Sequence, residues 1–199
     1  MEFNSVAFWR ARYEKGQNSG SGSYGAMAEF KAEAFNEFVK LHQIHSCCEF
    51  GVGDGNQLGY LKVPQFLGLD VAPAAIDLCI SKFADDASKS FMVYDPAHFV
   101  NNGAINADLG LSMDVILHLI EDQIYDSYMR NLCAASNSYL AIFNTASDAQ
   151  LPKMAVHNKY RDHRHWLSRC APEFKELSVA LCPAELGYPA ETGFYFYKK

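Results

Sequence analysis

The chain has 199 residues and a formal net charge of −6, and 49% of its residues are hydrophobic. This length and composition predict one globular domain with a single core over 1–199. The negative charge excludes a general attraction to nucleic acid, and no apolar run approaches the length that spans a membrane. Residues 1–12 lack an apolar signal core and the six cysteines form no C-x-x-C pair. We therefore expect a cytoplasmic protein with reduced thiols and no structural metal site.

The first 42 residues combine aromatic side chains with a glycine- and serine-rich stretch at 16–25. The composition of this stretch is typical of a flexible linker. Because a helical pattern follows it, the stretch is alternatively a ligand-binding loop whose free N–H groups and hydroxyls suit a carboxylate. Apolar residues at intervals of three and four predict the helix at 26–42. We expect 1–42 to form a lid loop and helix, and 43–199 to form the core.

Strand-like and helical segments alternate through the core. The predicted strands are 46–51, 65–70, 91–94, 109–113, 139–143, 176–181 and 193–197. Helical patterns separate the first five, which predicts a parallel sheet with helices on both faces. The last two strands have no helix between them and predict an antiparallel hairpin. The fold class is therefore an α/β, Rossmann-like sheet of seven strands, mostly parallel, with the last strand reversed.

The turn after the first strand carries an acid and three glycines, in the order Glu49, Gly51, Gly53 and Gly55. In the dinucleotide-binding fingerprint two residues separate the last two glycines, so the third glycine here arrives one residue early. A carboxylate at Glu49 would repel a pyrophosphate but would favour a ligand that carries an ammonium and a sulfonium. Further acids fall at or near predicted strand ends, namely Asp54, Asp70, Asp95 and Asp114. The pattern favours S-adenosylmethionine over a nicotinamide dinucleotide, and a nicotinamide-dependent oxidoreductase is the less favoured alternative.

The segment 49–55, followed by Asp70, resembles the cofactor signature of class I S-adenosylmethionine-dependent methyltransferases. The segment 108–119 is similar to the fourth-strand region of that family. The motif Trp9-x-x-Arg12-Tyr13 with 19–25 resembles a narrower group, the small methyltransferases of bacterial sugar and surface-polysaccharide pathways. The resemblance covers nearly the whole chain.

This resemblance implies roles for the residues around the methionine part of the cofactor. Gly51 and Gly53 would let the backbone approach it, and Glu49 would lie near its ammonium. Tyr13 and Ser23 would close over its carboxylate.

For the nucleoside part, the resemblance implies that Asp70 binds the ribose hydroxyls and that Asp95 meets the adenine amino group. Pro96 and Ala97 depart from the family pattern after Asp95 and leave that contact less well supported.

Asp114 and His118 are four residues apart at the end of the fourth strand and are the first candidate catalytic pair. On a helical turn they would share one face, where a carboxylate can orient a histidine as a base. Alternatively, Asp114 only caps a helix and His118 packs against the cofactor. A divalent cation at Asp114, Glu121 or Asp122 would have too loose a ligand set.

The segment 157–166 is the candidate acceptor-facing element. Arg161 and Arg164 suit an anionic acceptor such as a nucleotide-linked or phosphorylated sugar, because guanidinium binds phosphate through two hydrogen bonds. His157 is a further substrate contact, and His163 is a second candidate base. The alternative is a solvated amphipathic helix.

The sequence therefore predicts an S-adenosylmethionine-dependent methyltransferase that acts on a small molecule, with a sugar hydroxyl as the favoured acceptor. A non-catalytic cofactor-binding subunit is the alternative. Neither a nucleic acid nor a membrane is an expected partner.

Overall fold

Seven strands form one sheet in the order β3-β2-β1-β4-β5-β7-β6, in a computed structural model that describes residues 3–199. Strands β1 to β5 are parallel, and β7 is antiparallel to both of its neighbours, β5 and β6. This confirms the predicted sheet and the closing hairpin. The strands are β1 (Ser46–Phe50), β2 (Gln65–Asp70), β3 (Lys89–Val93), β4 (Ala107–Met113), β5 (Ser136–Thr145), β6 (Lys175–Leu181) and β7 (Thr192–Lys198).

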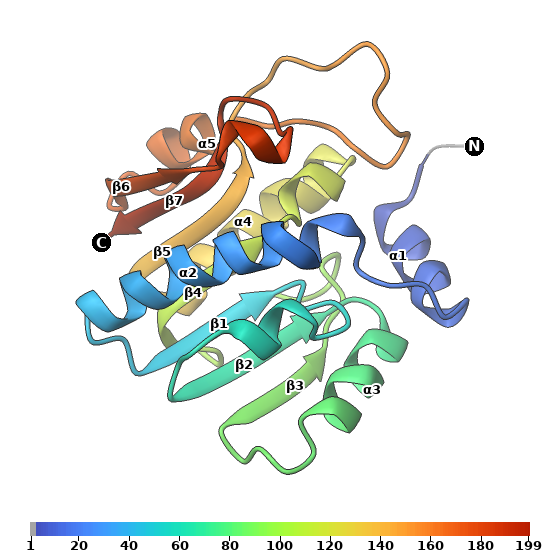
Figure 1. Cartoon of the computed structure of the whole chain (residues 1–199), viewed down its shortest axis with the longest axis vertical. Coiled ribbons are helices and arrows are strands. Elements are labelled where there is room, and N and C mark those ends of the chain that lie inside the picture. Colours follow the sequence, from blue (N-terminus) through green and yellow to red (C-terminus); the bar gives the residue numbers. More distant parts are fainter. Residues whose placement is uncertain (1–2) are drawn as a thin grey trace.

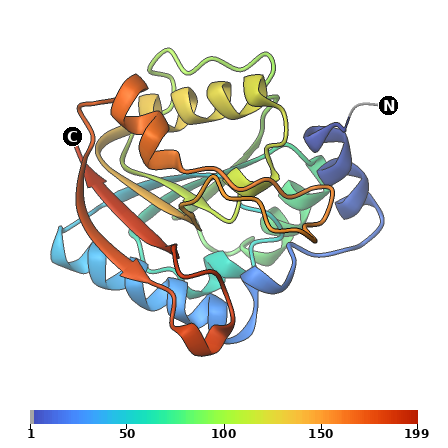
Figure 2. The same cartoon turned by 90° about the horizontal axis from the view of Figure 1, so that it is seen from above.

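Helices cover both faces of the sheet, as Figures 1 and 2 show. One face carries α2 (Gly25–Leu41) and α3 (Pro73–Lys82), and the other carries α4 (Asp122–Ala135) and α5 (His163–Cys170). Helix α1 (Ser5–Glu14) lies beyond the carboxyl ends of the central strands. Short 3-10 helices are η1 (Ser21–Ser23), η2 (Gln57–Tyr60), η3 (Ile116–His118) and η4 (Ala184–Leu186).

Side chains of the strands divide between two apolar clusters, one on each face of the sheet. Leu140 and Tyr195 join the cluster under α4, whereas Phe143 and Phe194 join the cluster under α2. Successive residues of a strand point to opposite faces, so a sheet that is buried on both sides needs continuous apolar runs. The runs in β4, β5 and β7 have this character.

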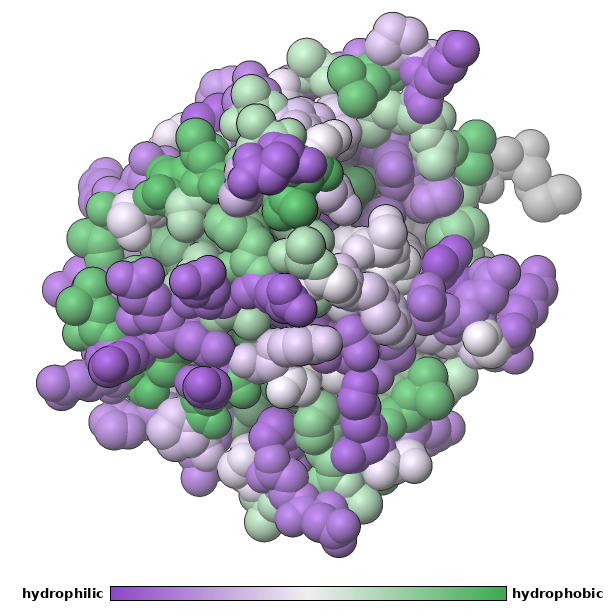
Figure 3. All heavy atoms as spheres, in the orientation of Figure 1, coloured by the Kyte–Doolittle hydropathy of each residue, from purple (hydrophilic) through white to green (hydrophobic). Residues whose placement is uncertain are grey.

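Helix α2 has one polar side and one buried side. Its outward residues are hydrophilic where the helix crosses the front of the molecule (Figure 3), and they include Glu33, Glu37 and Lys40. The buried side is apolar except at one position. Lys31 is 0% exposed and faces the sheet.

Two segments differ from the sequence expectations. Residues 5–14 form α1, whose first turn is capped by the Asn4 side chain through the Ala7 N–H group, although its sequence has no helical apolar stripe. The helical turn expected to carry both Asp114 and His118 begins only at Ile116, because Asp114 takes a left-handed backbone conformation with φ of 56°. The chain therefore turns through η3 first, and α4 begins only at Asp122. Within residues 3–199, no helix has both the length and the apolar character needed to cross a bilayer.

Candidate functional site

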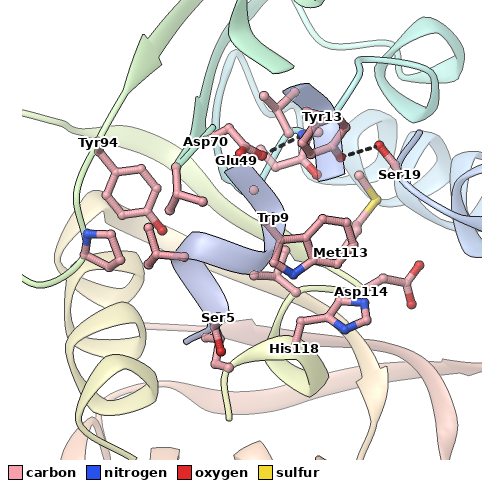
Figure 4. Close-up of a pocket in the computed structure, with 18 of the residues that line it drawn as sticks. Ser5, Trp9, Tyr13, Ser19, Glu49, Asp70, Tyr94, Met113, Asp114 and His118 are labelled. Atoms are coloured by element: carbon pink, nitrogen blue, oxygen red, sulfur yellow. Dashed lines mark hydrogen bonds between the residues drawn. The ribbon is translucent and has the colours of Figure 1, made fainter. Parts of the chain in front are cut away.

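A pocket lies at the carboxyl ends of β1, β2 and β4, and residues of α1 form one of its walls (Figure 4). Open α/β sheets bind ligands at this edge, where the strand order reverses. Eight of the residues selected from the sequence line this pocket: Tyr13, Ser23, Glu49, Gly51, Gly53, Asp70, Asp114 and His118. The fold thus brings the expected cofactor side and the expected catalytic pair to one cavity.

The turn after β1 can only be built from glycine at two positions. Gly51 and Gly53 have φ of 91° and 61°, in the left-handed region that side chains disfavour. A Cβ atom on Gly51 would lie 2.4 Å from the Val115 side chain, and one on Gly53 would lie 2.4 Å from Ser19 Oγ. The turn is therefore packed closely on both sides.

Glu49 places a carboxylate in the pocket wall without a partner for one of its oxygens. The residue is 3% exposed, and no hydrogen bond within the described chain reaches Oε2. Burial raises the pKa of Glu49 to about 8, and the positive charge of Lys31 partly opposes this rise. A buried, unpaired carboxylate at a cavity fits a cationic ligand group, because pairing would relieve the cost of its burial.

Asp70 is fixed at the end of the neighbouring strand. Its Oδ2 accepts a hydrogen bond from the Gly53 N–H group at 3.0 Å, and its Oδ1 accepts one from Ala72 at 2.9 Å. Burial raises its pKa to about 6. Each carboxylate oxygen keeps a further lone pair, so Asp70 is oriented to accept hydrogen bonds from ligand hydroxyls.

The glycine- and serine-rich stretch folds onto this turn instead of forming an unattached linker. Asp54 Oδ2 accepts hydrogen bonds from the Ser19 N–H group at 2.9 Å and from the Tyr24 hydroxyl at 2.8 Å. The Tyr13 hydroxyl lies 2.9 Å from Ser19 Oγ. Asp54, which the sequence marked only as one of several strand-end acids, thus anchors the stretch to the pocket.

Helix α1 covers the pocket and is attached at both of its ends. Trp9 and Tyr13 pack against Ala72 and Ala75, and the Arg10 guanidinium donates to the Val71 carbonyl at 2.8 Å.

At the start of α1, the Ser5 N–H group donates to Glu121 Oε1 at 2.8 Å. Such a carboxylate satisfies an N–H group that a helix leaves without an internal partner. Glu121 thus attaches the start of α1 to the segment that precedes α4. The next residue, Asp122, pairs with Lys159 and Arg161. In the described part of the chain, no group of three or more His, Cys, Asp or Glu side chains could hold a metal ion.

His118 lines the pocket beside Trp9, with their ring centroids 4.7 Å apart. Its Nδ1 lies 3.0 Å from the backbone carbonyl of His157. Because a carbonyl oxygen only accepts, the hydrogen is on Nδ1 and the lone pair of the neutral ring is on Nε2. Burial lowers the pKa of His118, which favours this neutral form. The sequence suggested that Asp114 orients His118. The structure shows instead that the His157 carbonyl does so.

Asp114 is paired instead with Lys31, which was not among the residues selected from the sequence. Lys31 Nζ lies 2.6 Å from Asp114 Oδ2. Lys31 lies four residues after Met27 and four before Phe35, both buried, so a charged residue on the apolar stripe of the predicted helix was the available signal.

Asp95 does not line the pocket, although Tyr94 and Pro96 beside it do. Its carboxylate accepts a hydrogen bond from the Ala97 N–H group at 3.0 Å and pairs with His98 at 3.2 Å. It therefore stabilises its own turn in this structure.

The two arginines selected as acceptor contacts lie outside the pocket. Arg161 donates to the Leu119 carbonyl and its guanidinium stacks on Tyr125, 4.4 Å from the ring centroid. Arg164 pairs with Asp162 at 2.7 Å. Both guanidinium groups thus stabilise the segments around α4 and α5.

The two histidines selected from the same segment, His157 and His163, differ in their surroundings. The His157 ring stacks on Phe8 with 4.7 Å between centroids, at the outer side of His118. His163 is 0% exposed, and its Nε2 lies 2.9 Å from the Tyr197 hydroxyl within the core. Burial lowers the pKa of His163 to about 3. The structure does not bring His163 to the pocket.

Comparison with protein-family models and with curated proteins finds no match to this chain. Solved structures do match over the full fold. Magnesium protoporphyrin IX methyltransferase from Synechocystis PCC 6803, with bound S-adenosylhomocysteine, has a TM-score of 0.66 and 13% identity, and 98% of each chain is covered. The N-methyltransferase NodS from Bradyrhizobium japonicum WM9, in complex with S-adenosylhomocysteine, has a TM-score of 0.65 and 15% identity, with 99% of each chain covered.

A third match is phosphoethanolamine N-methyltransferase 1 from Haemonchus contortus, with a TM-score of 0.64 and 13% identity. The match covers 98% of this chain and 48% of that one. At such identities the likeness concerns the fold. The chain therefore has the Rossmann-like fold of these S-adenosylmethionine-dependent methyltransferase structures.

Proposed function

We propose that the protein is an S-adenosylmethionine-dependent methyltransferase that methylates a hydroxyl of a small molecule, with a sugar as the favoured acceptor. The observation that carries the proposal is the buried carboxylate of Glu49, which has an unpartnered oxygen at the glycine turn. Structures with the same fold that were crystallised with S-adenosylmethionine or S-adenosylhomocysteine support the choice of cofactor.

The residues of the pocket fit the parts of this cofactor. Glu49 is suited to its ammonium and Asp70 to the ribose hydroxyls. Tyr13 and the serines of the neighbouring loop, Ser19 and Ser23, offer hydroxyls to its carboxylate. When bound, the cofactor supplies a methyl group made electrophilic by a positively charged sulfur.

The chain contributes orientation, exclusion of water and a place for the acceptor proton. His118 accepts that proton at Nε2, while its Nδ1 hydrogen stays bonded to the His157 carbonyl. Trp9 covers this side of the pocket and shields it from solvent. Asp114 offers a second hydrogen-bond acceptor beside His118.

The charges of the pocket disfavour an anionic group on the part of the acceptor that enters it. Among the described residues that line it there is no lysine or arginine, whereas Glu49, Asp70 and Asp114 are acidic. Arg161 and Arg164, which suited a phosphate in the sequence, are engaged elsewhere. A sugar ring with free hydroxyls meets these conditions, and any phosphate on the acceptor would stay outside the pocket.

Calorimetry with S-adenosylhomocysteine and NAD tests the cofactor, with Glu49→Gln as the paired variant. We expect S-adenosylhomocysteine to bind and the variant to bind it more weakly. Binding of NAD alone would overturn the proposal. Release of S-adenosylhomocysteine from S-adenosylmethionine, measured over a panel of free and nucleotide-linked sugars, then tests turnover. Cofactor binding without turnover on any acceptor favours the non-catalytic alternative.

A further inference from the structure

We propose that Lys31 is a positioning residue, whose ammonium holds Oδ2 of Asp114 and leaves Oδ1 to accept a hydrogen bond from the acceptor. The inference rests on the proposed function, since it assigns Asp114 to the acceptor side of a methyl-transfer site. It adds a residue that lies behind the pocket wall and acts through Asp114.

The burial of Lys31 is the first argument. The side chain is 0% exposed, its Nζ lies 5.1 Å from the centroid of the Phe143 ring, and Asp114 is its ion-pair partner within residues 3–199. Removing an ammonium from water is costly, and replacing a buried ion pair by apolar side chains of similar size is often neutral or stabilising. A lysine in this place therefore points to a requirement other than stability.

The conformation of Asp114 is the second argument. Its φ of 56° is unusual for a residue other than glycine, and its N–H group donates to the Phe143 carbonyl at 3.1 Å. Gly22 also lies close to this carboxylate, since a Cβ atom there would lie 2.8 Å from Asp114 Oδ2. Lys31 thus holds this carboxylate oxygen, and Gly22 leaves room for it.

The other oxygen of Asp114 remains available. Within the described residues no hydrogen bond engages Oδ1, the side chain is 24% exposed, and the residue lines the pocket beside His118. A carboxylate held at one oxygen and open at the other is oriented to receive a ligand hydroxyl.

The ratio of the affinities for sinefungin and S-adenosylhomocysteine tests this arrangement, and the experiment needs no identified acceptor. Sinefungin is a cofactor analogue in which a carbon bearing an amino group replaces the methylated sulfur, so its extra ammonium reports the charge at the methyl position. S-adenosylhomocysteine lacks that amino group but is otherwise similar to sinefungin. A substitution that alters the contacts shared by both ligands therefore leaves the ratio of their affinities unchanged. Calorimetry would compare the wild type with Lys31→Met, Asp114→Asn and the double variant. Lys40→Met, an exposed lysine of the same helix, is the matched control.

We expect Lys31→Met to raise the preference for sinefungin about fivefold or more, because Asp114 is then free to pair with the extra ammonium. Asp114→Asn should lower the preference by a similar factor, and Lys31→Met should add nothing in the Asp114→Asn background. Lys40→Met should leave the ratio unchanged. If Lys31→Met does not fold, Lys31→Gln removes the charge and retains a hydrogen-bond donor.

The proposal would be overturned if the Lys31 variants had the same ratio of affinities as the wild type. It would also be overturned if the Lys31 substitution changed this ratio equally in the wild type and in the Asp114→Asn background. Either result with intact binding of S-adenosylhomocysteine leaves the proposed function standing. Absence of S-adenosylhomocysteine binding by the wild type would remove the proposed function, and this inference with it.

Discussion

The Nδ1 atom of His118 lies 3.0 Å from the backbone carbonyl oxygen of His157, 39 residues further along the chain. A second contact parallels it, since the Lys159 N–H group donates to the Leu117 carbonyl at 2.7 Å. The connection between β5 and α5 therefore sets which nitrogen of His118 carries hydrogen. It leaves Nε2 as the basic atom of the ring.

His118→Asn tests His118 as the base for the acceptor hydroxyl. The asparagine side chain can keep the N–H donor near the Nδ1 position, but it has no atom that takes a proton. We expect kcat for an identified acceptor to fall about 10²- to 10⁴-fold, with little change in the affinity for S-adenosylhomocysteine. The measurements are steady-state turnover and calorimetry.

His157→Ala is the control for this variant, because it keeps the backbone carbonyl and removes only the ring that stacks on Phe8. Its effect on kcat should be much smaller than that of His118→Asn. Turnover of His118→Asn within a few-fold of the wild type would show that another group takes the proton.

The sheet could be predicted from the sequence because its signals are local. The apolar runs of β1, β2, β4 and β5 end at turn residues, and the stripe of α2 has the helical period. Helix α1 could not be predicted in this way, because its apolar residues contact different segments. Trp9 and Tyr13 pack on Ala72 and Ala75, whereas Phe8 stacks on His157. Its stability comes from contacts with distant segments.

The site was predictable where backbone geometry imposes a residue type. Gly51 and Gly53 are required by their positive φ angles, and Asp70 follows a strand at the ligand-binding edge. The partners of charged side chains are set by tertiary contacts that spacing does not reveal. Lys31 and Asp114 are 83 residues apart in the chain, so their ion pair had no local signal.

Gly53→Ala tests the close approach of the glycine- and serine-rich loop to the turn. The added Cβ atom would lie 2.4 Å from Ser19 Oγ and 2.9 Å from the Tyr13 hydroxyl. A positive φ costs alanine about 1–2 kcal/mol in addition. We expect a lower melting temperature and clearly weaker binding of S-adenosylhomocysteine. Gly59→Ala is the control, because nothing lies within 4 Å of a Cβ atom there. Equal effects of both substitutions would contradict this account of the turn.

Glu49→Gln tests how the free energy of unfolding depends on pH. The pKa of Glu49 is about 8 in the folded chain, above the ordinary value of 4.5, so the folded state holds a proton that the unfolded state has released. The contribution of this group to stability is therefore full below pH 4.5 and is lost as the pH rises towards 8. Glutamine does not titrate, so in Glu49→Gln this decrease in the free energy of unfolding between pH 5 and pH 8 should be absent. Denaturant titrations at the two pH values would measure it.

The same residue predicts how cofactor affinity depends on pH. An ammonium beside Glu49 favours the charged carboxylate, so binding below pH 8 releases a proton and the affinity for S-adenosylhomocysteine should increase from pH 6 to pH 8. The Glu49→Gln variant should bind more weakly and lack this rise. A wild-type affinity that is flat over this range would argue against Glu49 as the ammonium partner.

His163→Gln separates a core histidine from a catalytic one. Burial lowers the pKa of His163 from 6.5 to about 3, so the neutral ring contributes stability above pH 6.5, and this is lost as the pH falls towards 3. Glutamine can keep a polar group near the Tyr197 hydroxyl but does not titrate. We expect the variant to be less stable than the wild type at pH 7 but to lose less stability between pH 6.5 and pH 4, by denaturant titration. Because His163 is enclosed by the core away from the pocket, turnover at pH 7 should not change. A large fall in kcat with intact folding would instead assign His163 the role of a base.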